Sequence, residues 1–264
     1  MNQVEVKRRQ IQSFSYVLVC INIWVFGKSI GDNGLGYLAA AVLVFALFWV
    51  LTGKNLPDRM GRMLRGRNAK GQYRNVSKIR KNMMIFQIVE GLLGTLLCAG
   101  LGWMLLEKVF LVPYGSMILW ILCPALFLRC IQSVFLGYFQ SEGSELPSAV
   151  AAVLRQVFSL GFGLLFLGIF RGYGEKVSLL LKRTDFTSMY GAMGIALGIL
   201  FAEVLILLFV FVIYRGSMSG RTEAENGMKG TDSFFMQLRT LLIPMSGDIL
   251  RFLLLLLPLW NPMI

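Results

Sequence analysis

Four charged side chains lie inside long apolar runs of the sequence, namely Glu90, Arg129, Arg155 and Glu203. Each unpaired charge costs roughly 2.5–3.5 kcal/mol inside a membrane, so we expect these side chains to face one another or a hydrated cavity. A static cluster of ion pairs would hold helices together, whereas a polar cavity would bind an ion or a charged headgroup. We predict all four as substrate-binding residues of a cavity. The arginines would contact negative charge, and the glutamates would be their partners or ion-responsive groups.

The four charges are expected at similar depths on four different helices. A rise of about 1.5 Å per residue from the cytoplasmic ends places Glu90 about 10 Å deep, Arg155 about 12 Å deep and the other two about 16 Å deep. A further pair, Asp248 and Arg251, stands at i, i+3 on the last apolar segment, where the two charges can neutralise each other.

The composition places the chain in a bilayer. It has 264 residues, of which 56% are hydrophobic and 15% are charged, and one soluble core cannot bury that much apolar side chain. A net charge of +12 would suggest nucleic acid for a soluble protein, but the basic residues fall mainly between apolar runs, so we expect no nucleic acid partner. The chain has no histidine, and its four cysteines lie in apolar segments at no metal-ligand spacing. We therefore expect no metal and no cofactor.

Apolar runs of roughly 20 residues are long enough to cross about 30 Å of hydrocarbon. They must be helices, because an open strand edge has no hydrogen-bond partners in lipid. The sequence therefore predicts an all-α integral membrane protein with six full spans and a seventh that begins around Phe234. The six spans are expected near Ile11–Ile30, Gly36–Leu51, Met83–Leu106, Gly115–Phe139, Pro147–Phe170 and Tyr190–Tyr214.

The basic residues indicate an orientation. They gather at the N-terminus, between Lys54 and Lys81, and between Arg215 and Lys229, whereas the loops on the other side hold fewer. Because Lys and Arg resist translocation, we predict a cytoplasmic N-terminus in a multi-pass protein of the inner (cytoplasmic) membrane.

The most charged loop, Thr52–Asn82, carries apolar residues at helical spacing, namely Leu56, Met60, Met63 and Leu64. Arginines stand between them, and this pattern predicts a short amphipathic helix that lies on the inner leaflet. The basic residues of the loop either satisfy the orientation rule alone or also meet anionic headgroups, such as the diphosphate of a lipid-linked substrate, at about 1 kcal/mol each.

Small residues recur on the third, fifth and sixth spans, where they let helices approach closely. Pro124 in the fourth span and Pro244 and Pro258 in the seventh remove backbone hydrogen bonds and can kink a helix. Bent helices with charge near the midplane are typical of secondary transporters. The sequence contains no glycine-rich phosphate loop, no paired loop carboxylates and no nucleophile elbow, so we do not expect an enzyme.

One stretch resembles a known family. The motif GYFQ that begins at Gly137, a short polar hinge and the motif PSA that begins at Pro147 resemble the fourth-to-fifth helix junction of the polysaccharide-flippase branch of the multidrug/oligosaccharidyl-lipid/polysaccharide exporter superfamily. The likeness is to its stage V sporulation protein B and lipid II flippase type. The segments GDNGLGYLAAA and GRNAKGQYRNVSKIRKN are similar to the opening helices of the same family.

The resemblance implies a MATE-like flippase fold of two six-helix lobes, of which this chain would be the N-terminal half. The implied parts are a six-helix transmembrane lobe at 1–214, a cytoplasmic linker at 215–233 and the truncated start of a second lobe at 234–264. A truncated reading frame or a half-size protein would explain this length. The expected protein partner is then the missing second lobe or a second copy in a homodimer.

The chain departs from the family pattern at several positions. It has Leu136 in place of Arg, Ser141 in place of Gly, Ala151 and Ala152 in place of Ser-Gln, and Arg155 in place of Glu. The last change reverses a charge at a midplane position. The shared fold is therefore a safer inference from the resemblance than the family's ion coupling or substrate contacts.

The resemblance implies a flippase that moves a lipid-linked oligosaccharide or polysaccharide precursor across the cytoplasmic membrane by alternating access. Its partners would be a lipid-linked sugar diphosphate, such as an undecaprenyl-diphosphate oligosaccharide, and membrane lipids, with the coupling ion left open. Two alternatives remain. A MATE-type drug or cation antiporter would require an acidic, aromatic-lined cavity, and in a non-transporting scaffold for envelope assembly the midplane charges would be structural.

Overall fold

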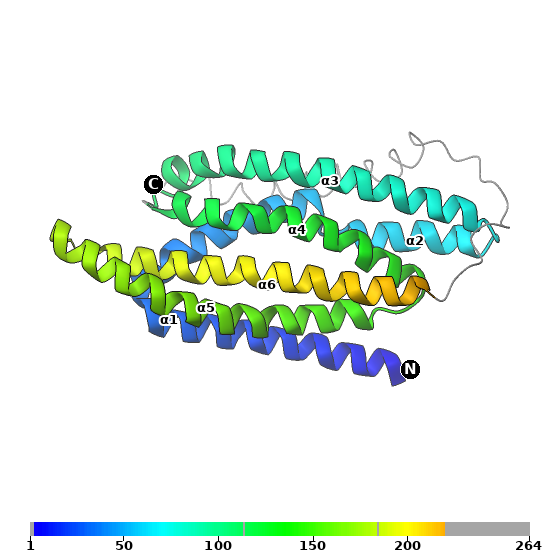
Figure 1. Cartoon of the computed structure of the whole chain (residues 1–264), viewed down its shortest axis with the longest axis horizontal. Helices are drawn as coiled ribbons and strands as arrows, with labels where there is room; N and C mark the ends of the chain where they lie inside the picture. Colours follow the sequence, from blue (N-terminus) through cyan, green and yellow to red (C-terminus); the bar gives the residue numbers. More distant parts are fainter. Residues whose placement is uncertain (1–2, 113, 184, 220–264) are drawn as a thin grey trace, which may run out of the picture.

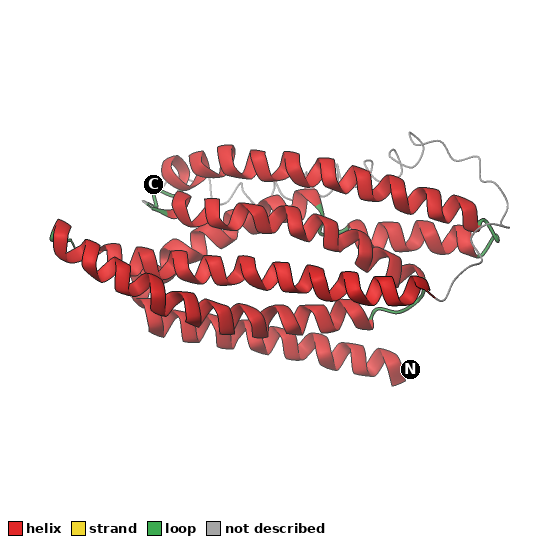
Figure 2. Cartoon of the chain, in the orientation of Figure 1, coloured by secondary structure: helices red, strands yellow, loops and turns green. Residues whose placement is uncertain are grey.

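The computed structural model describes residues 3–112, 114–183 and 185–219, which form helices and turns without a strand (Figure 2). The helices are α1 (Gln3–Thr52), α2 (Leu56–Asn68), α3 (Tyr73–Met104), the π-helical turn η1 (Leu105–Val109), α4 (Gly115–Ser141), α5 (Leu146–Leu181) and α6 (Asp185–Ser219). Five helical stretches in this part of the chain are long and apolar enough to cross a membrane. The prediction of an all-α, multi-pass membrane protein is therefore confirmed.

Helix α1 contains both of the first two predicted spans. Gly31 interrupts it with φ 73° and ψ 174°, a backbone conformation that essentially only glycine adopts. The chain reverses there, and the two halves of α1 run in opposite directions along the bundle (Figure 1). The halves, residues 3–30 and 32–52, are each long enough to cross about 30 Å of hydrocarbon. A single glycine therefore makes the turn between the first two predicted spans.

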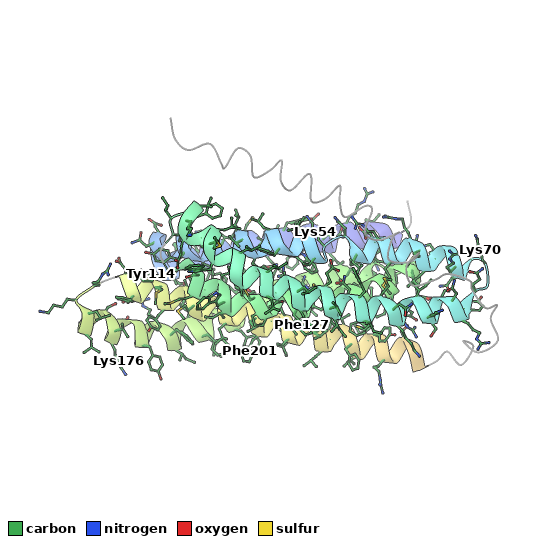
Figure 3. All side chains as sticks on the ribbon, turned by 90° about the horizontal axis from the view of Figure 1, so that it is seen from above. Lys54, Lys70, Tyr114, Phe127, Lys176 and Phe201 are labelled. Atoms are coloured by element: carbon green, nitrogen blue, oxygen red, sulfur yellow. The ribbon has the colours of Figure 1, made fainter. Side chains whose placement is uncertain are left out.

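Helix α2 continues in the direction of the second half of α1, and the other helical segments alternate in direction, so the bundle has two distinct ends (Figure 1). Figure 3 shows Lys70 at one end, and Tyr114 and Lys176 toward the other. The Lys70 end carries the α2–α3 turn, the α4–α5 turn and the last turn of α6, whereas the Lys176 end carries the reversal within α1 and the connections from η1 to α4 and from α5 to α6 (Figure 1). This alternation is the one that the apolar runs predict, and the cytoplasmic location of the Lys70 end stays a prediction.

Helix α2 confirms the predicted amphipathic helix but corrects its predicted environment. Its apolar face is buried in one cluster with residues of α3 and α4, whose members are Leu56, Met60, Leu64, Val76, Ile79, Met83 and Val134. A guanidinium nitrogen of Arg65 also donates a hydrogen bond of 2.7 Å to the backbone carbonyl of Gln140. The prediction that this face lies on the inner leaflet is wrong, because neighbouring helices cover it.

Helices α5 and α6 pack against each other through glycine. A Cβ atom placed on Gly198 would lie 2.3 Å from the backbone nitrogen of Gly163, so only glycine permits this approach. The prediction of close helix packing at small residues is confirmed here, although Gly161 faces open space. The contact matters for function because Arg155 lies on α5 and Glu203 on α6, and backbone contact fixes the register between them.

The polar hinge after α4 forms the predicted turn. Residues 142–145 connect α4 to α5, with Gly143 at φ 77°. Helix α6 continues to Ser219, beyond its predicted end at Tyr214. The rest of the predicted linker and the predicted seventh span, with Asp248 and Arg251, lie outside the described residues.

Candidate functional site

Three of the four predicted site residues meet inside the bundle. Arg129 projects from α4, Arg155 from α5 and Glu203 from α6, and both arginines form ion pairs with the one carboxylate. Helices α4 and α5 both pack against α6, so side chains at matching depths reach a common point. The expectation that these charges turn toward one another is confirmed for this trio. We call these three residues and Gln132 the arginine cluster.

The carboxylate of Glu203 is the centre of the cluster. Nε of Arg129 donates a hydrogen bond of 2.7 Å to Oε1, and a terminal nitrogen of the same guanidinium lies 2.5 Å from that oxygen. Nε of Arg155 donates to Oε2 over 3.1 Å and lies 2.9 Å from Oε1. The Glu203 side chain is 0% exposed, whereas the two arginines are 20% and 22% exposed. One fully buried acid therefore holds two cations that still reach open space.

Gln132 completes the network. Its Nε2 donates to Oε2 of Glu203 over 3.1 Å and to the Glu203 backbone carbonyl over 3.0 Å. Its Oε1 accepts a hydrogen bond of 2.8 Å from a terminal nitrogen of Arg155. The neutral amide thus bridges the acid and one of the cations, and it limits the directions in which the Arg155 guanidinium can turn.

Aromatic rings from the second half of α1 lie against the guanidinium group of Arg129. The Arg129 guanidinium carbon is 4.9 Å from the ring centroid of Phe45 and 5.8 Å from that of Trp49. Cations are attracted to aromatic faces at such distances, and the attraction is stronger away from water. The cluster is thereby connected to α1 as well as to α4, α5 and α6.

A cavity of about 200 Å³ opens beside the cluster, and both arginines line it. The lining reaches the α1–α2 junction and the α4–α5 turn at the Lys70 end, and its members are Trp49, Lys54, Pro57, Asp58, Arg129, Gln132, Ser133, Leu136, Gln140, Ser148 and Arg155. Among them are three cations and one carboxylate. The arginine cluster therefore borders an open cavity and is not sealed inside the protein. The excess of cations in the lining makes the cavity suited to an anionic group.

Glu90 lies apart from the arginine cluster. Its carboxylate accepts a hydrogen bond from the Gln87 side chain one turn earlier on α3, and it interacts electrostatically with Arg59 of α2. It is not among the residues that line the cavity. Of the two acids that the sequence offered as partners for Arg155, the structure pairs it with Glu203, whereas the carboxylate of Glu90 is hydrogen-bonded to Gln87 of its own helix.

Several residues of the site were not predicted, among them Gln132 and Lys54. Gln132 stands three residues after Arg129, and on a helix such residues share a face, so its polarity within an apolar run could have identified it. Lys54 was assigned to the basic loop, and nothing in the sequence indicates that the α1–α2 junction returns it to the cavity.

Comparisons with known proteins agree with the membrane character of the chain. Stage V sporulation protein B of Bacillus subtilis (strain 168) is 25% identical over 230 residues, which make up 86% of this chain and 42% of that protein. The chain thus spans less than half the length of this relative. No protein-family profile matches the chain, and no solved structure matches it. The similarity loosely supports the relationship that the GYFQ motif indicated.

Proposed function

We propose that this chain is one lobe of a membrane flippase that moves a lipid-linked oligosaccharide or polysaccharide precursor across the cytoplasmic membrane. The observation that carries the proposal is the pair of partly exposed arginines held on one buried acid beside an open cavity. The similarity to stage V sporulation protein B over most of this chain supports the same function.

The charge of the site favours an anionic ligand. Arg129 and Arg155 share the single carboxylate of Glu203, so the trio carries one net positive charge, and Lys54 adds a further cation to the lining of the cavity. A guanidinium has five N–H donors in a planar fork that matches phosphate oxygens. We assign the diphosphate of a lipid-linked sugar to these two guanidinium groups.

The other members of the cluster position the cations. Glu203 and Gln132 together hold Arg155 at two of its nitrogens, so the guanidinium needs little reordering when an anion arrives. Leaflet transfer requires the cavity to open at one end and then at the other, and a second lobe or a second copy of the chain would supply the opposing wall. The lipid tail would remain in the bilayer while the headgroup crosses.

The alternatives fit the site less well. A drug or cation antiporter needs an acidic cavity, whereas three cations and one carboxylate line this one. A scaffold would keep the cluster as a structural ion pair, but it would not need two cations that are each about one-fifth exposed. The aromatic wall formed by Trp49 is compatible with either transport function.

Transfer of a fluorescent undecaprenyl-diphosphate sugar between leaflets of proteoliposomes that contain the whole chain tests the proposal. Arg155→Gln leaves the Arg129–Glu203 pair in place and removes the net positive charge of the trio. We expect it to slow transfer by at least about tenfold, because a charge-assisted hydrogen bond is worth about 1.5–3 kcal/mol. Arg62→Gln, which removes an exposed cation of α2, is the matched control and should transfer at the wild-type rate. Equal rates for Arg155→Gln and wild type would contradict the assignment.

A further inference from the structure

A second polar cavity lies at the opposite end of the bundle. Its volume is about 280 Å³, and it is formed by the break in α1, the C-terminal part of α5 and the first turns of α6. Its lining residues are Lys28, Ser29, Ile30, Gly31, Leu167, Arg171, Thr187, Ser188 and Gly191. None of them belongs to the arginine cluster or its cavity.

Glycine geometry shapes this cavity. The glycine-only conformation of Gly31 turns the chain at its edge, and no atom comes within 4 Å of the position where a Cβ would lie. A Cβ on Gly191 would instead lie 2.9 Å from a side-chain carbon of Ile30, so the inner wall is tightly packed. The space is therefore open on the side of the break and closed toward the core.

The lining has the composition of an anion site. It contains two cations, Lys28 and Arg171, and three hydroxyl side chains, and it contains no carboxylate. The acids nearest in sequence, Asp32 and Asp185, do not line it. The volume is roughly nine times the share of one water molecule in the liquid, about 30 Å³, so a phosphate or diphosphate group fits together with water.

Both cations are held at the cavity by weak interactions that an anion can replace. Nζ of Lys28 lies 4.5 Å from the ring centroid of Trp24. Arg171 is paired with Glu175 over 3.2 Å, but the two side chains are 55% and 57% exposed, and exposed pairs of this kind contribute little stability. An incoming anion therefore competes only with a solvated carboxylate for the guanidinium.

We propose that this cavity, which we call the second anion site, binds a phosphate-bearing group through Lys28 and Arg171, assisted by the hydroxyl group of Ser188. The hydroxyl groups of Ser29 and Thr187 are already hydrogen-bonded to the Val25 carbonyl and to Ser178. The group is a lipid phosphate headgroup or a free phosphate or diphosphate, since the recognition chemistry is the same for both. The proposal does not rest on the flippase function, because it uses different residues at the other end of the bundle.

Tryptophan fluorescence gives each cavity its own reporter. Trp24 lies beneath Lys28, whereas Trp49 lines the cavity of the arginine cluster. The whole chain with phenylalanine in place of Trp49, Trp103, Trp120 and Trp260 keeps Trp24 as its one tryptophan. Placed in nanodiscs of phosphatidylcholine, it is titrated with inorganic diphosphate to report on the second anion site. The same chain in nanodiscs that contain phosphatidylglycerol tests the lipid source. Saturation by diphosphate alone, or a shifted signal with phosphatidylglycerol alone, identifies the free anion or the lipid respectively, and either result supports the site.

Substitutions distinguish anion binding at a specific site from attraction by the general surface charge. Removing both cations with Lys28→Gln and Arg171→Gln should weaken binding by roughly 30-fold, about fivefold for each basic residue. Glu175→Gln should tighten binding about twofold, because it releases Arg171 from its competing partner. Lys176→Gln removes a cation at the same end that does not line the cavity, and it should change affinity by less than about twofold.

The proposal is overturned if neither diphosphate nor phosphatidylglycerol changes the Trp24 signal. It is also overturned if Lys176→Gln weakens binding as much as the double variant does, because the anion would then respond to general surface charge. Loss of leaflet transfer in Arg155→Gln with an intact Trp24 response would support both proposals. Unchanged leaflet transfer in Arg155→Gln, together with an intact Trp24 response, would contradict the proposed flippase function and would still support this anion site.

Discussion

The arginine cluster predicts an unusual pattern of stability when its charges are removed one by one. Arg129→Gln and Arg155→Gln each leave Glu203 with one cation, so each single variant loses charge-assisted hydrogen bonds worth about 1.5–3 kcal/mol. The double variant leaves a carboxylate that is 0% exposed with only the amide of Gln132 as a partner in the cluster. Removing the second arginine strands this buried carboxylate and therefore costs about 3–5 kcal/mol, more than the first removal, so the double loss should exceed the sum of the single losses by about 1 kcal/mol or more.

Adding Glu203→Gln to the double variant should then restore stability. The triple variant carries no charge in the cluster, and its amide side chains can hydrogen-bond to one another. We expect a recovery of about 3 kcal/mol, the lower end of the cost of an uncompensated buried charge. For a chain of this size that corresponds to roughly 6–12 °C in the melting temperature.

Thermal unfolding of the detergent-purified variants, followed by circular dichroism, measures these differences. The order of melting temperatures should be wild type, single variants, triple variant and then double variant. A triple variant that melts at or below the double variant would refute the reasoning, because removing a stranded carboxylate would then bring no gain. Additive losses from the two single variants would show that the arginines do not share Glu203 in the folded chain.

Two further predictions concern the glycines that shape the bundle. Gly198→Ala places a Cβ against the backbone of Gly163, so it should destabilise the chain by about 1–3 kcal/mol through overpacking, whereas Gly161→Ala, which faces open space, should be neutral in the same melting assay. Gly31→Ala forces a side chain into a glycine-only conformation, so it should cost about 1–3 kcal/mol, whereas Gly36→Ala lies in open space within the helix and should be neutral or slightly stabilising.

The apolar runs predicted the number of spans among the described residues, but they located the helix ends poorly. Helix α5 runs to Leu181, where the prediction ended at Phe170, and α6 begins at Asp185, where the prediction began at Tyr190. Hydropathy reports where the apolar stretch ends, whereas a helix continues as long as its backbone hydrogen bonds do. The helices therefore extend past the hydrophobic stretches as an antiparallel pair at the Lys176 end.

Sequence periodicity showed which face of α2 is apolar but not what covers it. The pattern of Leu56, Met60 and Leu64 would look the same on a leaflet or against protein, and only the positions of α3 and α4 decide between them.

Sequence reasoning reaches the same limit at the arginine cluster. Depth along a helix follows from counting residues, whereas the direction of a side chain around the axis depends on how each helix is rotated by its neighbours. In the structure Glu203 meets the arginines, whereas Glu90 is bonded to Gln87 of its own helix.

The charge reversal at Arg155 gains a physical meaning from its partner. In the family pattern that the sequence resembles, a glutamate stands at this position, and beside Arg129 and Glu203 it would give the trio one net negative charge. With Arg155 the same three positions carry one net positive charge around the same buried carboxylate. A net negative cluster favours a cation and a net positive one favours an anion, so the charge of the side chain at position 155 decides the class of ligand that the cavity can attract. The positive sign of the net charge of the cluster therefore supports an anionic headgroup as the ligand, more than the mere presence of charged residues does.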